Sequence, residues 1–113
     1  WYPVGNNPNS PFDTPKRYAR GLKDVQDTAI ASNRDPTEIA CGVYIIWYSL
    51  GKAAKTIKGE RQTFTGSPSE ILSDIAEYEK VGLQHLVIGG ESNDLETCLN
   101  RMRVFNKEVM RCI

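Results

Sequence analysis

Two apolar runs, set between amphipathic helical patterns, constrain this fold more than any other feature of the sequence. Residues 39–50 (IACGVYIIWYSL) and 84–88 (QHLVI) are rich in the β-branched and aromatic residues that strands favour. The first run has few polar side chains on either face, which is typical of parallel strands covered by helices. Helical patterns precede, separate and follow the two runs. The order helix, strand, helix, strand, helix therefore predicts an α/β fold with parallel strands.

The first helical pattern begins at Thr14 and Pro15, because a hydroxyl caps free N–H groups and proline costs nothing at the first helical position. The polar, proline-containing segment 32–36 ends it. The side chains that we expect to be buried lie at helical spacing. They are Tyr18, Leu22, Val25 and Ala29.

The second helical pattern is expected over residues 68–81. Ser67 and Glu70 are spaced as a capping box around Pro68, and Gly82 stops the helix. The expected buried stripe consists of Ile71, Ile75 and Tyr78, helped by Leu72.

A third helix is expected to start near Asn93 and Asp94, with Glu96 placed to close a capping box. The expected stripe consists of Leu95, Leu99, Met102, Phe105 and Val109.

Composition excludes several classes of function for this chain of 113 residues. Fourteen basic and 14 acidic residues give no net charge, which removes the simplest argument for a nucleic-acid or membrane partner. No apolar run is long enough to span a bilayer, and no secretion signal is visible. Three cysteines without CxxC spacing and the single His85 argue against disulfides and a metal site. A cytoplasmic protein is the expectation.

Two strands with apolar faces cannot complete a parallel sheet, because each strand would leave an unpaired edge. The missing strands must come from a longer chain or from another copy of this one. We favour the longer chain, since the sequence opens on Trp1, without methionine, in a polar stretch rich in proline and asparagine.

Four segments occur in an order that resembles one enzyme family. They are WYPVG, SNRDPTEI, FTGSPSEILSDIAEYEKVGLQHLVI and LETCLNRMRVFNKEVM. Together they resemble the C-terminal third of the bacterial-luciferase-like oxidoreductases, especially the branch that uses a deazaflavin coenzyme. The resemblance covers the whole chain except residues 51–60.

This resemblance implies that residues 1–113 are the C-terminal fragment of a single (β/α)8 TIM-barrel domain, about two β/α units containing strands seven and eight. The implied cofactor is coenzyme F-420, with FMN as the alternative. The implied reaction is hydride transfer to, or monooxygenation of, a small organic substrate. The catalytic residues would lie upstream, so the isolated fragment should be inactive. The alternative is a non-enzymatic α/β interaction module that homo-oligomerisation completes.

Three residues are the candidate cofactor contacts at the carboxyl ends of the strands. In the resembled family, the tryptophan that corresponds to Trp1 lies at a strand exit beside the flavin-like ring, although simple packing remains an equal interpretation. Gly89 and Gly90 follow residues 84–88 and would contact a ligand on the same rim as Trp1. The favoured interpretation of these glycines is a tight turn with positive φ, placed on the lip of the site.

For the remaining polar candidates, a structural role is the favoured interpretation. Lys52, Lys55, Lys58 and Arg61 could form a basic lid over a phosphate, but a solvated loop is the favoured interpretation. His85 is expected near the amino end of its strand, which is the stability face of a barrel. No nucleophile or paired carboxylates are visible.

Overall fold

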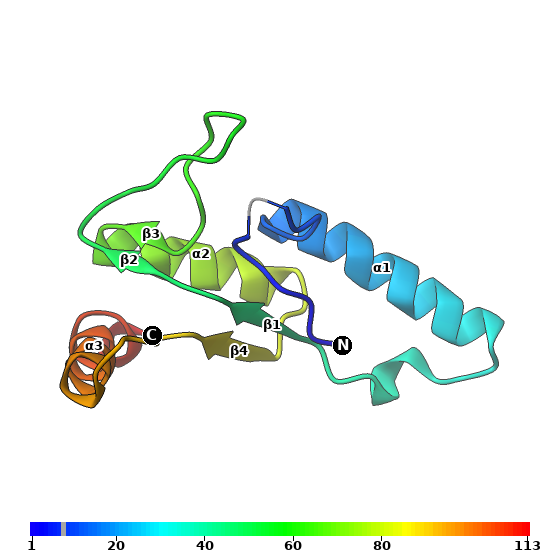
Figure 1. Cartoon of the computed structure of the whole chain (residues 1–113). Helices are drawn as coiled ribbons and strands as arrows, with labels where there is room; N and C mark the ends of the chain where they lie inside the picture. Colours follow the sequence, from blue (N-terminus) through cyan, green and yellow to red (C-terminus); the bar gives the residue numbers. More distant parts are fainter. Residues whose placement is uncertain (8) are drawn as a thin grey trace.

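The computed structural model describes residues 1–7 and 9–113, and it is a mixed α/β structure (Figure 1). The α/β class with parallel strands is therefore confirmed. In chain order the elements are α1 (Pro15–Ala31), the 3-10 helix η1 (Pro36–Glu38), β1 (Gly42–Ile45), β2 (Ser49–Leu50), β3 (Thr65–Gly66), α2 (Pro68–Lys80), β4 (His85–Ile88), α3 (Leu95–Glu108) and the 3-10 helix η2 (Met110–Cys112).

The main sheet pairs β1 with β4 in parallel, as predicted, with Gly42 opposite His85 and Ile45 opposite Ile88. The single strand predicted over residues 39–50 is divided in two. β1 ends at Ile45, and β2 begins at Ser49 and pairs in parallel with β3. The short β3 was not predicted, because two residues carry no periodicity.

Residues 1–5 form a third parallel segment on the other edge of β1. The amide of Gly42 donates to the Trp1 carbonyl at 2.9 Å, and the amide of Tyr44 donates to the Pro3 carbonyl at 3.0 Å. The amide of Gly5 donates in turn to the Tyr44 carbonyl at 2.7 Å. Val4 pairs in parallel with Tyr44. The order in the main sheet is therefore segment 1–5, β1, β4, which is also their order along the chain. β2 and β3 lie between β1 and β4 in the chain and form a separate sheet.

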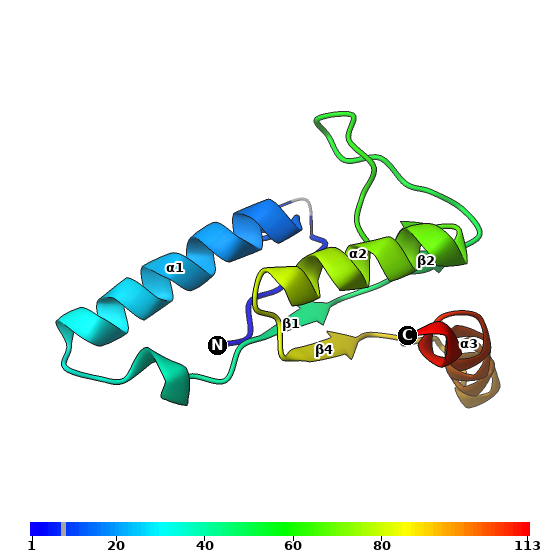
Figure 2. The ribbon, with the colours of Figure 1, turned by 180° about the vertical axis from the view of Figure 1, so that it is seen from behind.

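Helices α1 and α2 lie on the same side of β1 and β4 in both views (Figures 1 and 2). The core lies between these helices and the sheet, because β1 sends Val43 and Ile45 to that side, and both are fully buried. The helices meet them mainly with Tyr18, Leu22, Ile71 and Tyr78. The predicted stripes of α1 and α2 therefore face the core, while Val25, Leu72 and Ile75 are partly exposed.

The predicted caps of α1 and α2 are confirmed. Thr14 accepts a hydrogen bond from the amide of Arg17, and Ser67 and Glu70 form the reciprocal capping box. Gly82 follows the end of α2 with φ of +99°, a left-handed conformation that glycine adopts readily.

Helix α3 departs from the predictions in two respects. Its cap is Asp94, which accepts from the amide of Thr97, so Glu96 lies one position too early for the expected capping box. Of the predicted stripe, Phe105 and Val109 are buried, whereas Leu95 is 74% exposed. Leu95, Leu99 and Met102 stay exposed because α3 lies beyond the carboxyl end of β4, whereas Phe105 and Val109 belong to the core (Figure 1).

Candidate functional site

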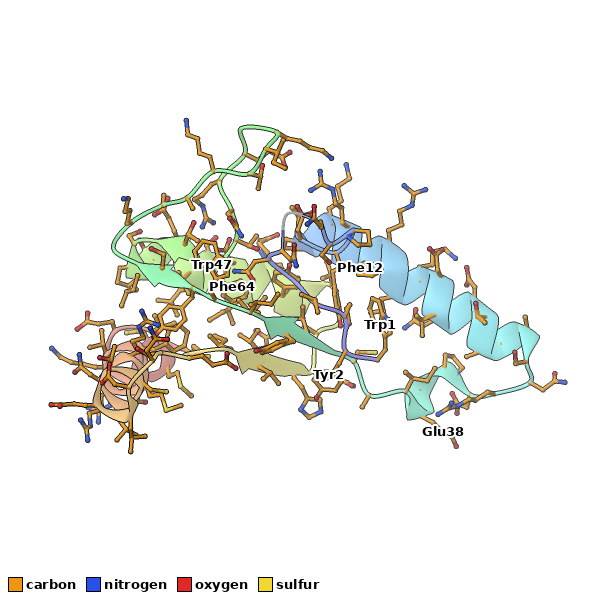
Figure 3. The ribbon with its side chains drawn as sticks, viewed as in Figure 1. Trp1, Tyr2, Phe12, Glu38, Trp47 and Phe64 are labelled. Atoms are coloured by element: carbon orange, nitrogen blue, oxygen red, sulfur yellow. The ribbon has the colours of Figure 1, made fainter. Side chains whose placement is uncertain are left out.

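In the part of the chain that the structure describes, one face of the main sheet has no covering helix (Figures 1 and 2), and we call it the open face. Side chains alternate along parallel strands, so the neighbours of the buried Val43 and Ile45 point to the opposite side. Figure 3 shows the same alternation in the first segment, where Trp1 points toward α1 and Tyr2 points away from it. The open face consists of Tyr2, Val4, Gly42, Tyr44, His85, Val87 and Gly89.

At the carboxyl end of the open face, Gly89 lies against two groups from β1 and its continuation. A Cβ atom on Gly89 would lie 2.3 Å from the Ile46 carbonyl oxygen and 3.2 Å from the Tyr44 hydroxyl. The glycines with positive φ are Gly51, Gly59, Gly66 and Gly82. The predicted positive-φ turn at Gly89 and Gly90 is therefore wrong. Close approach of the two strand ends, rather than backbone conformation, requires glycine at position 89.

At Gly90, the position that a side chain would occupy lies on the other side of the sheet. A Cβ atom there would meet no atom within 4 Å, because Gly90 borders an apolar cavity of about 370 Å³ between α2, β4 and α3. Gly89 therefore lies against the end of β1, whereas Gly90 borders the apolar cavity. The cavity is lined by Tyr48, Ile75, Leu86, Ile88, Gly90, Met102, Phe105, Met110 and Ile113.

Asn6 and Trp47 lie at the carboxyl ends of segment 1–5 and β1. The side-chain amide of the fully buried Asn6 donates to the Trp47 carbonyl, and Gln62 donates to the Asn6 carbonyl. The Asn6 Oδ1 atom is buried and has no hydrogen-bond partner among the described residues. The Trp47 side chain is 40% exposed. The sequence singled out Trp47, within residues 47–51, as following a strand, but it did not single out Asn6.

Trp1 lies at the opposite end of the sheet, beside the first residue of β1. Its ring packs against Tyr18 and Phe12, with centroid distances of 5.1 and 5.3 Å. The prediction that Trp1 follows a strand and shares a rim with Gly89 is therefore wrong. The physical reason is that residues 1–5 themselves pair with β1, which places Trp1 at the amino end of the parallel segments.

The basic residues after β2 fall into two groups. Lys52, Lys55 and Lys58 are exposed, as the solvated-loop interpretation predicts. Arg61 differs, because it forms a bidentate ion pair with Asp74 of α2. Burial at position 74 could not be read from the sequence, since the predicted stripe of α2 was apolar.

Two tyrosines of the core have phenol pKa values above the usual value of a tyrosine. Burial raises the pKa of Tyr18 to about 12, and burial also raises the pKa of Tyr78. Both phenols belong to the core on the helix-covered side of the sheet.

His85 is an exposed residue at the start of β4, and its ring centroid lies 6.2 Å from that of Tyr2.

The carboxyl end of the open face therefore presents the Tyr44 hydroxyl beside Gly89. The Asn6 side-chain oxygen near the same strand ends is buried, and the Trp47 side chain is 40% exposed. Within residues 1–7 and 9–113, no group of three or more His, Cys, Asp or Glu side chains is arranged to hold a metal ion.

Comparisons with protein-family models, curated proteins and solved structures found no match to this chain. In the described part of the chain, no helix has the length and apolar character required to cross a membrane.

Proposed function

We propose that these residues are the last β/α units of a luciferase-like (β/α)8 barrel. The observation that carries the proposal is the chain-ordered parallel sheet: segment 1–5, β1 and β4 lie side by side in sequence order, with helices on one face. In a barrel, each strand lies beside its predecessor and the helices cover the outer side.

The open face supports the same proposal. Val4, Tyr2 and Val87 are 37%, 49% and 46% exposed, which is high for apolar and aromatic side chains on a strand. In a barrel this face would point inward and pack against side chains from the other strands. The edge of β4 is also unpaired in the main sheet, so a further parallel strand can hydrogen-bond to it.

For the activity, we propose a flavin-type oxidoreductase with coenzyme F-420, or alternatively FMN, bound at the carboxyl end of the barrel. The bound ring would supply hydride transfer to or from a small organic substrate. Two features near the carboxyl ends of the strands support this proposal. The buried Asn6 side-chain oxygen lacks a hydrogen-bond partner among the described residues, and the Trp47 side chain is 40% exposed.

A second candidate function rests on the same exposed surface. Another copy of the chain could cover the open face and form a non-enzymatic interaction module, since large exposed apolar patches commonly mark interfaces.

The test is to express the whole gene product and the 113-residue chain separately and to titrate each with coenzyme F-420 and with FMN. The enzyme proposal predicts one bound ring per intact protein, detected by ring fluorescence and absorbance, and none on the isolated chain. Failure of the intact protein to bind either ring, together with a stable homo-oligomer of the isolated chain, would favour the interaction module.

A further inference from the structure

The cavity of about 370 Å³ between α2, β4 and α3 has side-chain walls of one chemical kind. Aliphatic, thioether and aromatic groups line it, including those of Ile75, Leu86, Ile88, Met102 and Phe105. Among the described residues that line the cavity, the hydroxyl belongs to Tyr48, and it already donates to the Arg101 carbonyl at 3.0 Å. A charged or strongly polar ligand would therefore lose its hydration without gaining a side-chain partner, so the lining favours an uncharged apolar ligand.

Contacts on both sides of α3 hold the cavity open. The Tyr48 ring packs edge-on against the Phe105 ring, with a centroid distance of 4.9 Å and an interplanar angle of 66°. One turn earlier, the Arg101 carbonyl accepts from Tyr48, and the Arg101 guanidinium donates to the Glu91 carbonyl at 2.6 Å. Because α3 can close onto β4 only by breaking these contacts, the cavity is a pre-formed feature of the fold, as ligand sites usually are.

The volume sets the size of the ligand. A cavity of about 150 Å³ with similar apolar walls binds benzene, which has six carbon atoms. The cavity of about 370 Å³ therefore has room for an apolar molecule of up to roughly 15 carbon atoms. Met102 and Met110 are more than half exposed and so lie at its entrance, where flexible methionine side chains can adapt to the shape of a ligand.

We propose that this cavity binds an uncharged apolar molecule of the size of a two-ring aromatic hydrocarbon. Burial of apolar surface against α2, β4 and α3 supplies the binding free energy. Because the cavity lies on the helix-covered side of the sheet, this inference goes beyond the proposed function and does not depend on it.

The test titrates naphthalene into the intact protein and into two variants. Gly90→Leu adds an apolar side chain at the cavity wall, where a Cβ atom would meet no atom within 4 Å and the backbone does not have a positive φ. Asn100→Leu is the matched control, because it adds the same side chain at an exposed position of α3 that does not line the cavity. Naphthalene fluorescence gives the dissociation constants, and unfolding temperatures are measured without ligand. Nuclear Overhauser contacts between naphthalene protons and protein methyl groups locate the bound molecule.

We expect naphthalene to bind the intact wild-type protein with Overhauser contacts to Ile75, Leu86 and Met102. Gly90→Leu should weaken this binding by about tenfold or more, because the leucine side chain takes apolar space that the ligand needs. The unfolding temperature of Gly90→Leu should stay the same or rise, since the new side chain fills a cavity. Asn100→Leu should bind naphthalene as wild type does.

Each contrary result would overturn the proposal. Equal affinities of wild type and a stable Gly90→Leu variant would place the bound molecule elsewhere, and Overhauser contacts to Val87 would place it on the open face. Absence of binding by the intact wild-type protein would refute the site, and contacts between Leu86 and another segment or copy would then show what fills the cavity. If Gly90→Leu lowers the unfolding temperature, the Overhauser contacts of the wild-type protein decide the question alone.

Discussion

The guanidinium of Arg61 and the carboxylate of Asp74 form a bidentate ion pair, with Nη1–Oδ2 and Nη2–Oδ1 distances of 3.0 and 2.5 Å. The same Asp74 carboxylate accepts from the amide of Phe64 at 2.7 Å, and Arg61 also donates to the Thr65 carbonyl at 2.6 Å. The pair therefore fastens the end of the long loop after β2 to the inner face of α2.

Asp74→Asn should destabilise the fold by about 1–3 kcal/mol, because it leaves Arg61 without its partner at a site where the carboxylate is buried. Urea denaturation measures the change. Asp27→Asn is the matched control, since Asp27 pairs with Lys23 on the exposed surface of α1. This substitution should change the free energy of unfolding by less than about 0.5 kcal/mol. Equal effects of the two substitutions would contradict the structural role of the Arg61–Asp74 pair.

Gly89→Ala should lower the free energy of unfolding, and Gly90→Ala should leave it nearly unchanged. An added methyl group at position 89 would lie 2.3 Å from the Ile46 carbonyl oxygen, whereas position 90 has open space. We expect a loss of about 1–3 kcal/mol for the first variant and less than about 0.5 kcal/mol for the second, from denaturant unfolding. Similar stabilities of the two variants would argue against close approach at Gly89.

The isolated 113-residue chain should self-associate through its open face at micromolar concentrations, because apolar side chains and an unpaired strand edge are exposed. The double variant Tyr2→Ser, Val87→Ser should lower the average mass measured by sedimentation. Ile57→Ser is the control, since Ile57 is 87% exposed but lies in the loop after β2. A wild-type chain that stays monomeric would refute this prediction.

The capping box of α2 should make stability depend on acid pH. The backbone amide and the hydroxyl of Ser67 donate to Glu70 at 2.8 and 2.9 Å, and these bonds lower the pKa of Glu70 from its usual 4.5. A lowered pKa stabilises the fold above pH 4.5, and the contribution is lost as pH falls through the folded pKa. The stability difference between wild type and Glu70→Gln should therefore shrink on acidification. Denaturation midpoints at several pH values test this, and a constant difference would count against it.

Trp1→Ala should destabilise the fold, because the Trp1 ring packs against Tyr18 and Phe12 beside α1. We expect a loss of about 2–3 kcal/mol in thermal or urea unfolding. Trp47→Ala removes the same side chain from a 40% exposed position and should cost less. The reverse order of stabilities would show that Trp1 makes the weaker packing contacts.

Local signals in the sequence determined most of the elements of this protein. The starts of α1 and α2, the stop at Gly82 and the strand at His85–Ile88 agree with the predictions. These features depend on hydrogen bonds and side-chain periodicity within a few residues, so neighbouring letters are sufficient to identify them. The parallel arrangement also followed from the alternation of helices and strands.

Tertiary structure alone decided how distant segments meet. Residues 1–5 pair with β1 some 40 positions later, which moves Trp1 to the amino end of the sheet and leaves Asn6 at the carboxyl end. Gly89 is required by the Ile46 carbonyl, a contact that no local pattern encodes. Leu95, Leu99 and Met102 of the α3 stripe remain exposed because burial depends on a partner surface, and the periodicity of one helix does not specify where that surface lies.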